Sequence, residues 1–569
     1  MRRILALLLA LAMIAAACGG DDDDSTAGED EGTDTDSSET TEAEGDDETE
    51  VTVQSVDEDE GQELAGQTVT AEPLGDRGPE PSGTLDFSWH TAFSPRWFDP
   101  AINTSSVSQF ATQYILHDAL VKGIPGQTFA PSLAEEYTIA DDFTWAEFRL
   151  REGLTFHDGS PLTTEDVAFS YENYSGANSG PLQDNLDNIE IVDDLNIRFN
   201  FTGPFLDFLV LYGTTASGAG WILPSDYYQE VGPDDFLLAP IGAGPFRFVE
   251  NQDNTTIVYE ANTDYWKKNP GVETLNFLSI TDPATRVSAL QTGEVDLINV
   301  IPGDLLDAVR DDENLTLQPT TAVPFWIEFV GYDDPESPFN DVRVREAVAI
   351  ALNRDQINEA ETGGGGETVG QWIPKDWPGA LAAEPIEYDI ERAKELMAEA
   401  GYADGFEVDQ LTPLPNYFSL GERIITSLAE IGITTSLNQM DRGAFLGDIN
   451  AGKEGTLTGI LVNISGAGGG ASARVANFAT CDGSASRICD EFIDERYGAF
   501  VDATDADERQ KILDEIQQYI IDEHIFVYAY TLGLNMGQGP DVVQPADEVW
   551  AQIPQYVYPG LWEDITVQG

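Results

Sequence analysis

An acidic tract divides this chain into a part that can build a hydrophobic core and a part that cannot. From Gly19 to Ser82 the sequence consists largely of Asp, Glu, Ser, Thr and Gly, and apolar residues are nearly absent before Val51. Like charges repel along such a tract, and little apolar surface is available to offset the entropy lost on ordering, so residues 19–82 are predicted to be a disordered linker. An acidic interaction tail is the alternative interpretation. The folded body is therefore expected at residues 83–569.

The tract is preceded by a segment with the pattern of an export signal. Two arginines are followed by an unbroken apolar run, Ile4 to Ala17, which is too short for a membrane-spanning helix of about 20 residues. The run ends in Ala-Ala-Ala-Cys and resembles a bacterial lipobox, in which the cysteine is acylated and becomes the new N-terminus. We expect residues 1–18 to be a lipoprotein signal peptide and Cys18 to be a membrane tether, because two acyl chains suffice for stable anchoring. An ordinary signal peptide cleaved near an unrelated cysteine is the alternative.

The net charge narrows the classes of partner. The chain carries 103 acidic and 27 basic residues, a formal net charge of -76. Nucleic acid is not expected as a partner, because its phosphates are bound by surfaces rich in Lys and Arg. No segment after the signal is long and apolar enough to cross a membrane, so residues 83–569 are expected to be soluble and to form two or three domains. The surplus of carboxylates suits salty surroundings, where it is screened.

Cysteine and histidine are sparse. After Cys18 only Cys481 and Cys489 remain, and in an exported chain a pair this close indicates a disulfide, with two free buried thiols as the alternative. The four histidines have no metal-ligand spacing. The sequence lacks H-E-x-x-H, G-x-S-x-G and the phosphate-binding G-x-x-x-x-G-K-[ST], and carboxylates are too frequent for a glycosidase-like pair to be informative. We therefore expect no metal, no cofactor and no catalysis.

Short strands and helices alternate along the body without a repeat, which is typical of an α/β fold. Thr163 or Thr164 is expected to cap a helix with an acidic first turn, Asp193-Asp194 to turn a hairpin, and Gly293 to end a helix. Apolar residues alternate from Phe143 to Leu150, as in a half-buried strand. Strands are predicted at 84–89, 143–150 and on both sides of the hairpin in 189–201, and helices at 108–121, 163–174, 284–293, 342–357 and 391–402.

Six blocks of sequence resemble a known family. The first, LAEEYTIADDFTWAEFRLREGLTFHDGSPLTTEDVAFSYE, is similar to the signature of bacterial ABC-transporter solute-binding proteins of family 5, a group that binds oligopeptides, dipeptides, nickel complexes and related solutes. Five more follow in the family's order, so that the resemblance covers nearly all of residues 85–530. They are PIGAGPFRFVE, DYWKKNPGVETLNF, ATRVSALQTGEVDL, PFNDVRVREAVAIALNRDQI and YDIERAKELMAEAGYADGFEV.

The resemblance implies a two-lobed α/β clamshell, similar to type II periplasmic binding proteins, whose hinge is crossed twice by the chain. Solute would bind between the lobes, and closure would create the form that docks on a membrane permease. The energy would come from a partner ATPase, so no nucleotide site is needed. On this basis we place lobe I at 83–115, 240–315 and 530–569, an inserted subdomain at 116–239, and lobe II at 316–529.

The same resemblance implies a monomeric receptor for a peptide or related small solute. It would be lipid-anchored on the outer face of the cytoplasmic membrane, with the permease and ATPase subunits of an ABC importer as partners. Some members of the family act as surface sensors, and others are encoded without a permease. A secreted hydrolase is the rival from a different functional class, and it would be distinguished by turnover of a bound solute.

Loops that the family places at its cleft supply candidate site residues from both lobes. Solute clefts are lined by aromatic side chains with a few polar groups. Gly242 and Gly244 in PIGAGPF resemble hinge-region glycines, with plain turn glycines as the alternative, and each tryptophan is equally compatible with core packing. The candidates for ligand contact are Trp89, Phe93, Ser105, Ser106, Trp326, Trp372 and Trp377.

One loop departs from the pattern of peptide-binding relatives. These carry a stretch of the form D-Y-x-D-P-D-N-F, whose first acid takes the peptide ammonium group. The cysteine pair and an Asn-Phe dipeptide align it with residues 471–478, which puts Ala471 at the first acid and Arg474 at the second. An arginine fork suits carboxylate or phosphate, so we expect solutes with an exposed anionic group. The alternative is that the glycines at 466–470 shift the register and leave Arg474 paired to a surface acid.

Overall fold

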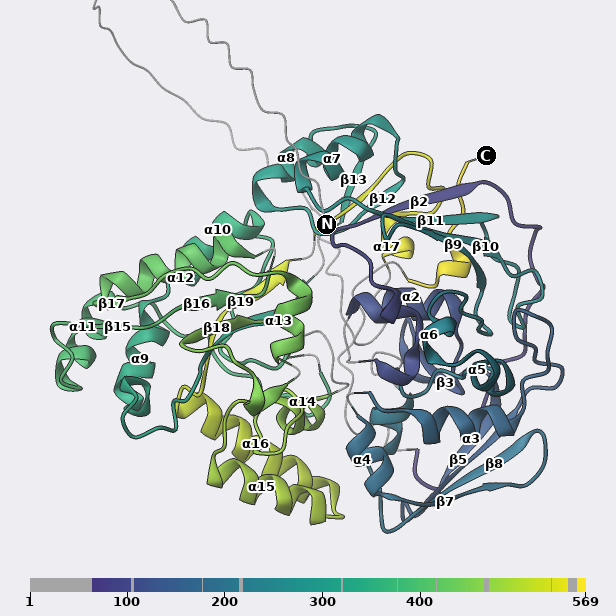
Figure 1. The fold of residues 1–569 in the computed structure, drawn as a ribbon, viewed down its shortest axis with the longest axis horizontal. Coiled ribbons are helices and arrows are strands. Elements are labelled where there is room, and N and C mark those ends of the chain that lie inside the picture. The colour runs from purple at the N-terminus through teal and green to yellow at the C-terminus, as the bar shows by residue number, and fades with distance from the viewer. Residues whose placement is uncertain are drawn as a thin grey trace, which may run out of the picture. The chain divides into compact units, whose positions relative to one another are not determined.

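The structure is a computed structural model. It describes residues 64–103, 107–176, 178–213, 218–318, 321–375, 377–415, 417–449, 451–464, 470–533, 535–550 and 560–568. The predicted signal peptide, Cys18 and the linker over 19–63 lie outside these residues. Of the helices described, none has the length and apolar character needed to cross a membrane. The described residues belong to one compact unit, which has the predicted mixed α/β content (Figure 1).

Lobe I is built on a seven-stranded mixed sheet with the order β13-β20-β12-β2-β11-β10-β9. The central strand β2 is parallel to β11 and β12, and its Leu85 and Phe87 are fully buried. These strands come from the three separate segments that the resemblance implied. The elements of lobe I are β2 (Thr84–Trp89), α2 (Val107–Leu116), β9 (Phe246–Gln252), β10 (Thr256–Ala261), β11 (Thr274–Ser279), α7 (Pro283–Thr292), β12 (Leu297–Ile298), α8 (Leu306–Arg310), β13 (Thr316–Gln318), β20 (Met536–Gln538) and α17 (Ala546–Val549).

The inserted subdomain has a five-stranded antiparallel sheet, order β1-β5-β6-β8-β7, and a separate hairpin of β3 and β4. Its core is aromatic, with the rings of Phe148, Phe199 and Phe208 in mutual contact. Its elements are β1 (Thr68–Thr70), β3 (Val121–Ile124), β4 (Gln127–Pro131), β5 (Ala134–Ile139), β6 (Trp145–Leu150), α3 (Thr164–Asn173), α4 (Ser179–Asp184), β7 (Leu186–Ile191), β8 (Asn196–Phe201), a π-helix (Leu209–Gly213), α5 (Ser225–Val231) and α6 (Pro233–Phe236).

Strand β1 corrects the predicted extent of the linker. Thr68–Thr70 pairs antiparallel with β5, and Leu64 and Val69 pack against the apolar cluster of the subdomain. Further on, Arg77 Nη2 donates to the carbonyl of Thr263 at 2.5 Å. Residues 64–82 are therefore part of the body, because the consecutive β-branched residues Thr68–Thr70 can pair with an open sheet edge even within an acidic tract.

Lobe II contains a four-stranded sheet of order β16-β18-β14-β19, with the short pair β15 and β17 beside it. On one face of β14, Phe325 contacts Tyr417, which directly precedes α12, and Phe329 stacks on Phe339 ahead of α9. Its elements are β14 (Thr321–Phe329), α9 (Val342–Ala351), α10 (Arg354–Thr362), α11 (Ile390–Glu399), β15 (Phe406–Glu407), β16 (Leu411–Pro413), α12 (Phe418–Glu430), β17 (Ile433–Thr434), α13 (Arg442–Ile449), β18 (Ile460–Asn463), α14 (Ala471–Phe478), α15 (Glu491–Asp502), α16 (Ala506–Asp522) and β19 (Phe526–Gly533).

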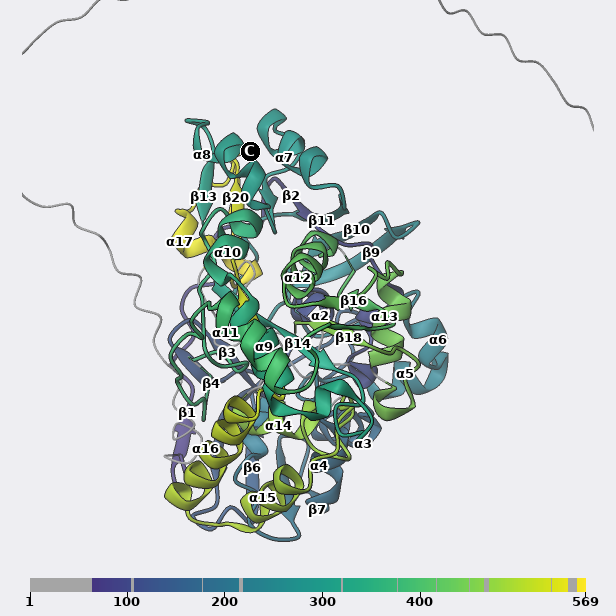
Figure 2. The same cartoon turned by 90° about the vertical axis from the view of Figure 1, so that its left-hand side faces the viewer.

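The chain passes between the two lobes through a pair of neighbouring strands. It leaves lobe I after β13 and enters lobe II in β14, then returns from β19 to β20 (Figures 1 and 2). Strands β14 and β19 are antiparallel partners, with Trp326 opposite Tyr528. Two predicted boundaries shift as a result: residues 316–318 belong to the sheet of lobe I, and residues 530–533 to the sheet of lobe II.

Local sequence signals act as predicted at most helix ends. Thr163 caps α3 in a reciprocal box with Asp166, and Gly293 ends α7 in the left-handed region at φ 71°. Strands β7 and β8 form the predicted hairpin. The helix predicted over 342–357 is instead two helices. It breaks because the side chain of Asn353 accepts a hydrogen bond from Gln356 N and so begins a new helix.

The helix predicted over 108–121 ends early, at Leu116, and the next residues form a buried polar junction. Asp118 accepts hydrogen bonds from Tyr265 Oη at 2.8 Å and Trp266 Nε1 at 2.7 Å, both in lobe I. Lys122 Nζ lies 3.0 Å from its other carboxylate oxygen, which Ser132 Oγ also contacts at 2.7 Å. This network fixes the start of the subdomain against lobe I.

We predict that Asp118→Ala destabilises the body by about 3–5 kcal/mol, because it leaves Lys122 and three other donors, Tyr265, Trp266 and Ser132, without their carboxylate acceptor. Urea unfolding followed by tryptophan fluorescence measures the change. The matched control is Asp264→Ala, which removes a largely exposed carboxylate 3.0 Å from Arg247 and is expected to cost at most about 1 kcal/mol. Equal losses in the two variants would contradict the role given to Asp118.

Candidate functional site

Four of the predicted site residues meet at one place in lobe II. The guanidinium of Arg474, on α14, lies over three indole rings, with its central carbon 4.8 Å from the ring centroid of Trp326, 5.1 Å from Trp372 and 5.3 Å from Trp377. The arginine is 0% exposed and the three tryptophans are buried. A cation over an indole face is stabilised by the ring quadrupole, most strongly where water is excluded. We call these four residues the Arg474 box.

The box is held by elements far apart in the sequence. Trp326 is on β14, and its ring meets Phe478 at the end of α14 with centroids 5.4 Å apart. Trp372 and Trp377 lie in the irregular segment between α10 and α11, and the ring of Trp372 packs against Phe526 of β19 at 4.6 Å. The face of β14 that carries Trp326 thus lies against α14, and α14 carries the guanidinium of Arg474.

The electrostatics of the box favour an acceptor or an anion. Burial lowers the pKa of Arg474 to about 9, so the side chain is still charged at neutral pH. The indole N–H groups of Trp326 and Trp372 have no hydrogen-bond acceptor among the residues that the structure describes. Buried N–H groups are nearly always paired in native proteins. The box therefore offers two unused donors beside a buried positive charge.

Helix α14 also contacts the inserted subdomain. Ala473, next to Arg474 in sequence, belongs to the apolar cluster of the subdomain, while Ala471 and Val475 belong to the large cluster that includes lobe II. A second link is the ion pair of Arg509 on α16 with Asp207 of the subdomain, at 2.5 Å. The box therefore lies where the two halves of the body meet.

Sequence reasoning missed an acid on the same face of β14. Glu328 follows Trp326 by two residues, is 3% exposed, and accepts a hydrogen bond from Asn463 Nδ2 at 3.2 Å. Burial raises its pKa to about 7, against an opposing contribution from Arg487. The signal was available, because an acid in the middle of the apolar strand PFWIEF must either be paired or lie at a site.

Trp89 and Phe93 do not join the box. Trp89 is 1% exposed, stacks on Phe277 and donates from Nε1 to Thr91 Oγ1 at 2.9 Å. Phe93 also packs against Phe277, and its ring meets Trp97 edge-on. Both belong to the core of lobe I, which for Trp89 is the alternative that the sequence left open and for Phe93 departs from the expected contact with ligand. Ser105 and Ser106 lie outside the described residues, so their predicted contact with ligand stays a prediction.

The two glycines predicted at the hinge lie where the subdomain rejoins lobe I. A Cβ on Gly242 would sit 1.9 Å from the carbonyl oxygen of Leu116, and one on Gly244 would sit 2.6 Å from that of Ile115. Both glycines allow the backbone to pass against the end of α2. Neither glycine lies where the chain crosses between the lobes, at β14 and β19. A hinge role for them would therefore concern the junction of the subdomain with lobe I, and it stays a prediction.

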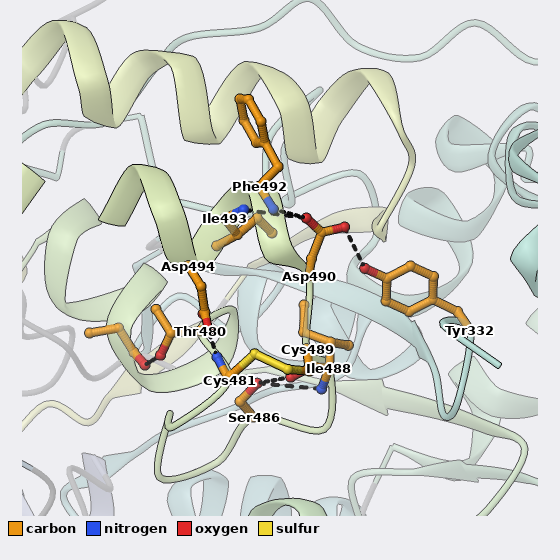
Figure 3. The surroundings of a disulfide bond; sticks show 11 residues. Tyr332, Thr480, Cys481, Ser486, Ile488, Cys489, Asp490, Phe492, Ile493 and Asp494 are labelled. Carbon is orange, nitrogen blue, oxygen red and sulfur yellow. Dashed lines mark hydrogen bonds between the residues drawn. A yellow bond between two sulfur atoms is a disulfide. The ribbon is translucent and has the colours of Figure 1, made fainter. Parts of the chain in front are cut away.

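The two cysteines beyond α14 are joined by a disulfide, Cys481–Cys489 (Figure 3). The Cys481 amide donates to the carboxylate of Asp494 at 2.7 Å, in the first turn of α15. Asp490 caps the same helix and accepts a hydrogen bond from Tyr332 Oη at 3.3 Å. The disulfide and these hydrogen bonds together hold the loop that connects α14 to α15.

Comparison with known proteins agrees with this architecture. The sequence profile described as Bacterial extracellular solute-binding proteins, family 5 Middle, matches residues 128–486. The chain belongs to the bacterial extracellular solute-binding proteins of family 5. This family 5 protein is 30% identical over 410 residues to the Di/tripeptide-binding protein 2 of Pseudomonas aeruginosa, a match that covers 64% of this chain and 73% of the relative. It is 28% identical over 398 residues to the Dipeptide-binding protein of Escherichia coli, with 64% and 73% covered.

Solved structures give the fold. The periplasmic binding protein DppA from Helicobacter pylori, in complex with a peptide, has a TM-score of 0.74 at 22% identity and covers 86% of this chain and 99% of its own. The binding protein AgaA from Agrobacterium ("A.tumefacien R10"), in complex with agropinic acid, has a TM-score of 0.72 at 24% identity, with 86% and 99% covered. The family 5 protein therefore has the type II periplasmic-binding-protein fold.

We predict that stability depends on pH through Glu328. Its pKa is about 7 in the folded protein and 4.5 when unperturbed, so its contribution is fully present below pH 4.5 and is lost as the pH rises through 7. Glu328→Gln should therefore gain up to about 3 kcal/mol relative to the wild type between pH 5 and pH 8. Chemical unfolding at both pH values measures this difference. If the difference in unfolding free energy between Glu328→Gln and the wild type is the same at pH 5 and pH 8, the pKa of Glu328 is not raised in the folded protein.

We also predict that Cys481 and Cys489 are oxidised in the exported protein. Alkylation without reduction, followed by mass spectrometry, should leave both thiols unlabelled. Because the loop is short, the double variant Cys481→Ala/Cys489→Ala should lose at most about 2–3 kcal/mol of unfolding free energy. Two alkylated thiols in the unreduced protein would refute the bond.

Proposed function

We propose that this protein is the solute receptor of an ABC importer, that it captures a peptide or related small solute between its lobes, and that it delivers the solute to a membrane permease. The Arg474 box is the observation that carries this proposal, because it places a buried cation and two unused indole donors where the halves of the body meet. The names of the relatives supply the solute class, since two of them are named for dipeptide or di/tripeptide binding.

The charge of the box narrows the solute class further. An ammonium group would be repelled by Arg474, whereas a carboxylate or phosphate could accept from its guanidinium and from the indole N–H groups of Trp326 and Trp372. We therefore propose a solute with an exposed anionic group, or a peptide held through its carboxylate. Such a solute would contact lobe II at the box and the opposite half across α14, so its binding would favour the closed form.

A surface sensor without import would use the same binding site, and the solute panel below does not separate it from a receptor. Deletion of the proposed partner permease, followed by a solute-uptake assay, does separate them. A secreted hydrolase would consume its solute, whereas a receptor retains it unchanged at a ratio of one per chain. Recovery of intact solute from the complex, measured by mass spectrometry, is the outcome expected here.

We predict that a panel of di- and tripeptides, presented as free acids and as C-terminal amides, contains stabilising ligands among the free acids. A ligand at 100 times its Kd should stabilise the body by about 2.7 kcal/mol, which thermal unfolding detects. Arg474→Met should weaken a free-acid ligand at least tenfold by calorimetry and change its amide little. Arg392→Met, an exposed position on α11, is the matched control. Equal losses for acid and amide would remove Arg474 from the site.

We also predict that Cys18 is the lipidated N-terminus. Cys18→Ala should release the mature body into the medium or leave an uncleaved precursor, because acylation is the proposed attachment. Membrane fractionation and the mass of the N-terminal peptide measure both outcomes. A wild-type N-terminal peptide without lipid mass, together with unchanged fractionation of the variant, would contradict the anchor.

A further inference from the structure

A second polar cluster lies at the carboxyl ends of two parallel strands of lobe I. Strands β2 and β12 are neighbours in register, with Ser88 opposite Ile298. His90 directly follows β2 and Asn299 directly follows β12. In open α/β sheets the carboxyl ends of parallel strands are where ligands bind. This region is separate from the Arg474 box, which is on α14 and β14.

The polar atoms of this region lack partners. By strict geometry Ser88 Oγ, His90 Nδ1 and both side-chain atoms of the Asn299 amide make no hydrogen bond among the residues that the structure describes, although the Asn299 side chain lies near enough to His90 to raise its pKa by hydrogen bonding. Ser88 and Asn299 are 0% exposed and His90 is 7% exposed. Each unpaired buried polar group is costly, and native proteins rarely leave several together unless a ligand or solvent completes the set.

Positive charge surrounds these groups without a carboxylate partner. The guanidinium of Arg286, on α7, donates hydrogen bonds to three backbone carbonyls. The distances are 2.9 Å to Asn299, 2.7 Å to Ile280 and 2.6 Å to Val300. Arg442, the first residue of α13 in lobe II, donates to the Pro415 carbonyl at 3.1 Å. Within the described part of the chain, neither arginine takes part in an ion pair, although the protein carries 103 acids.

Charged groups of both lobes act on His90. Burial lowers the pKa of His90 well below its usual value, Arg442 and then Arg286 lower it further, and Asn299 opposes them. The same two arginines act on buried Tyr417, which precedes α12 in lobe II, and counteract the rise that burial causes in its pKa. Lobe I therefore contributes Ser88, His90, Asn299 and Arg286 to one cluster, and lobe II contributes Arg442 and Tyr417. We call these six residues the His90 cluster.

We propose that the His90 cluster is a second binding subsite, which takes an anionic group, a carboxylate or a phosphate, of the captured solute. The hydroxyl of Ser88, the Asn299 amide and the Arg442 guanidinium all supply donors, whereas a metal ion or an ammonium group would meet two arginines that form no ion pair within the described residues. Asn299 Oδ1 can accept from His90, which turns the Nδ2 donors of the amide toward the anion. An anion here would attract groups of both lobes and so favour closure.

The proposal rests on the proposed function for the identity of the solute, but small anions test the cluster directly. Sodium phosphate and sodium acetate, each compared with sodium chloride at the same ionic strength and pH 7.5, are titrated against the wild-type protein in thermal unfolding. We expect a saturable rise in Tm with at least one of the two, which also separates phosphate from carboxylate recognition. His90→Gln and Arg442→Gln should each weaken that response at least tenfold.

The matched control is Arg310→Gln, which removes an exposed arginine on α8 whose partner is Asp307 at 2.5 Å and should leave the anion response unchanged. A non-saturable response, or one retained in both cluster variants, overturns the subsite. If a free-acid peptide binds the wild type and both cluster variants equally, the subsite is wrong and the receptor proposal stands. If no peptide binds while the cluster variants lose the anion response, the subsite stands and the solute class of the proposed function is wrong.

Discussion

The candidate site in lobe II depends on the pairing of β14 with β19. In the lobe II sheet β14 is an inner strand and β19 the edge strand beside it, and these antiparallel strands are also the two paths by which the chain enters and leaves that lobe. Trp326 and Glu328, on the same face of β14, are positioned by this pairing, and α14 then covers that face with Arg474. A single ladder therefore both connects the lobes and orients the candidate site.

Three buried arginines are held largely by backbone carbonyls, in contrast to the buried ion pair of Lys122 with Asp118. Arg286, Arg345 and Arg354 each donate to two or more backbone carbonyls. Carbonyls satisfy the guanidinium without adding a second desolvated charge, which a buried ion pair would require. The guanidinium of Arg474 also lies over three indole faces, which adds a cation–π contribution to its burial.

The sequence predicted the fold and part of the site for identifiable physical reasons. Helix caps such as Thr163 and the terminal Gly293 act over a few residues, so their consequences are visible locally. The convergence of Trp326, Trp372 and Trp377 followed from the family resemblance, but Trp89 fell in the core because one sequence cannot distinguish a core indole from a cleft indole. The His90 cluster was not predictable, since Ser88, Asn299 and Arg442 are brought together only by parallel strand pairing and by the approach of the second lobe.

The attachment of β1 has a mechanical consequence. Three residues, Thr68–Thr70, join the sheet of the subdomain at its edge, and the chain N-terminal to Leu64 reaches the body through them. A pulling force on that N-terminal side is therefore carried first by a short ladder with β5 and not by either lobe. A ladder of three residue pairs is expected to open before the central strands do, so such a force would detach Thr68–Thr70 from β5 while the sheets of the two lobes stay intact.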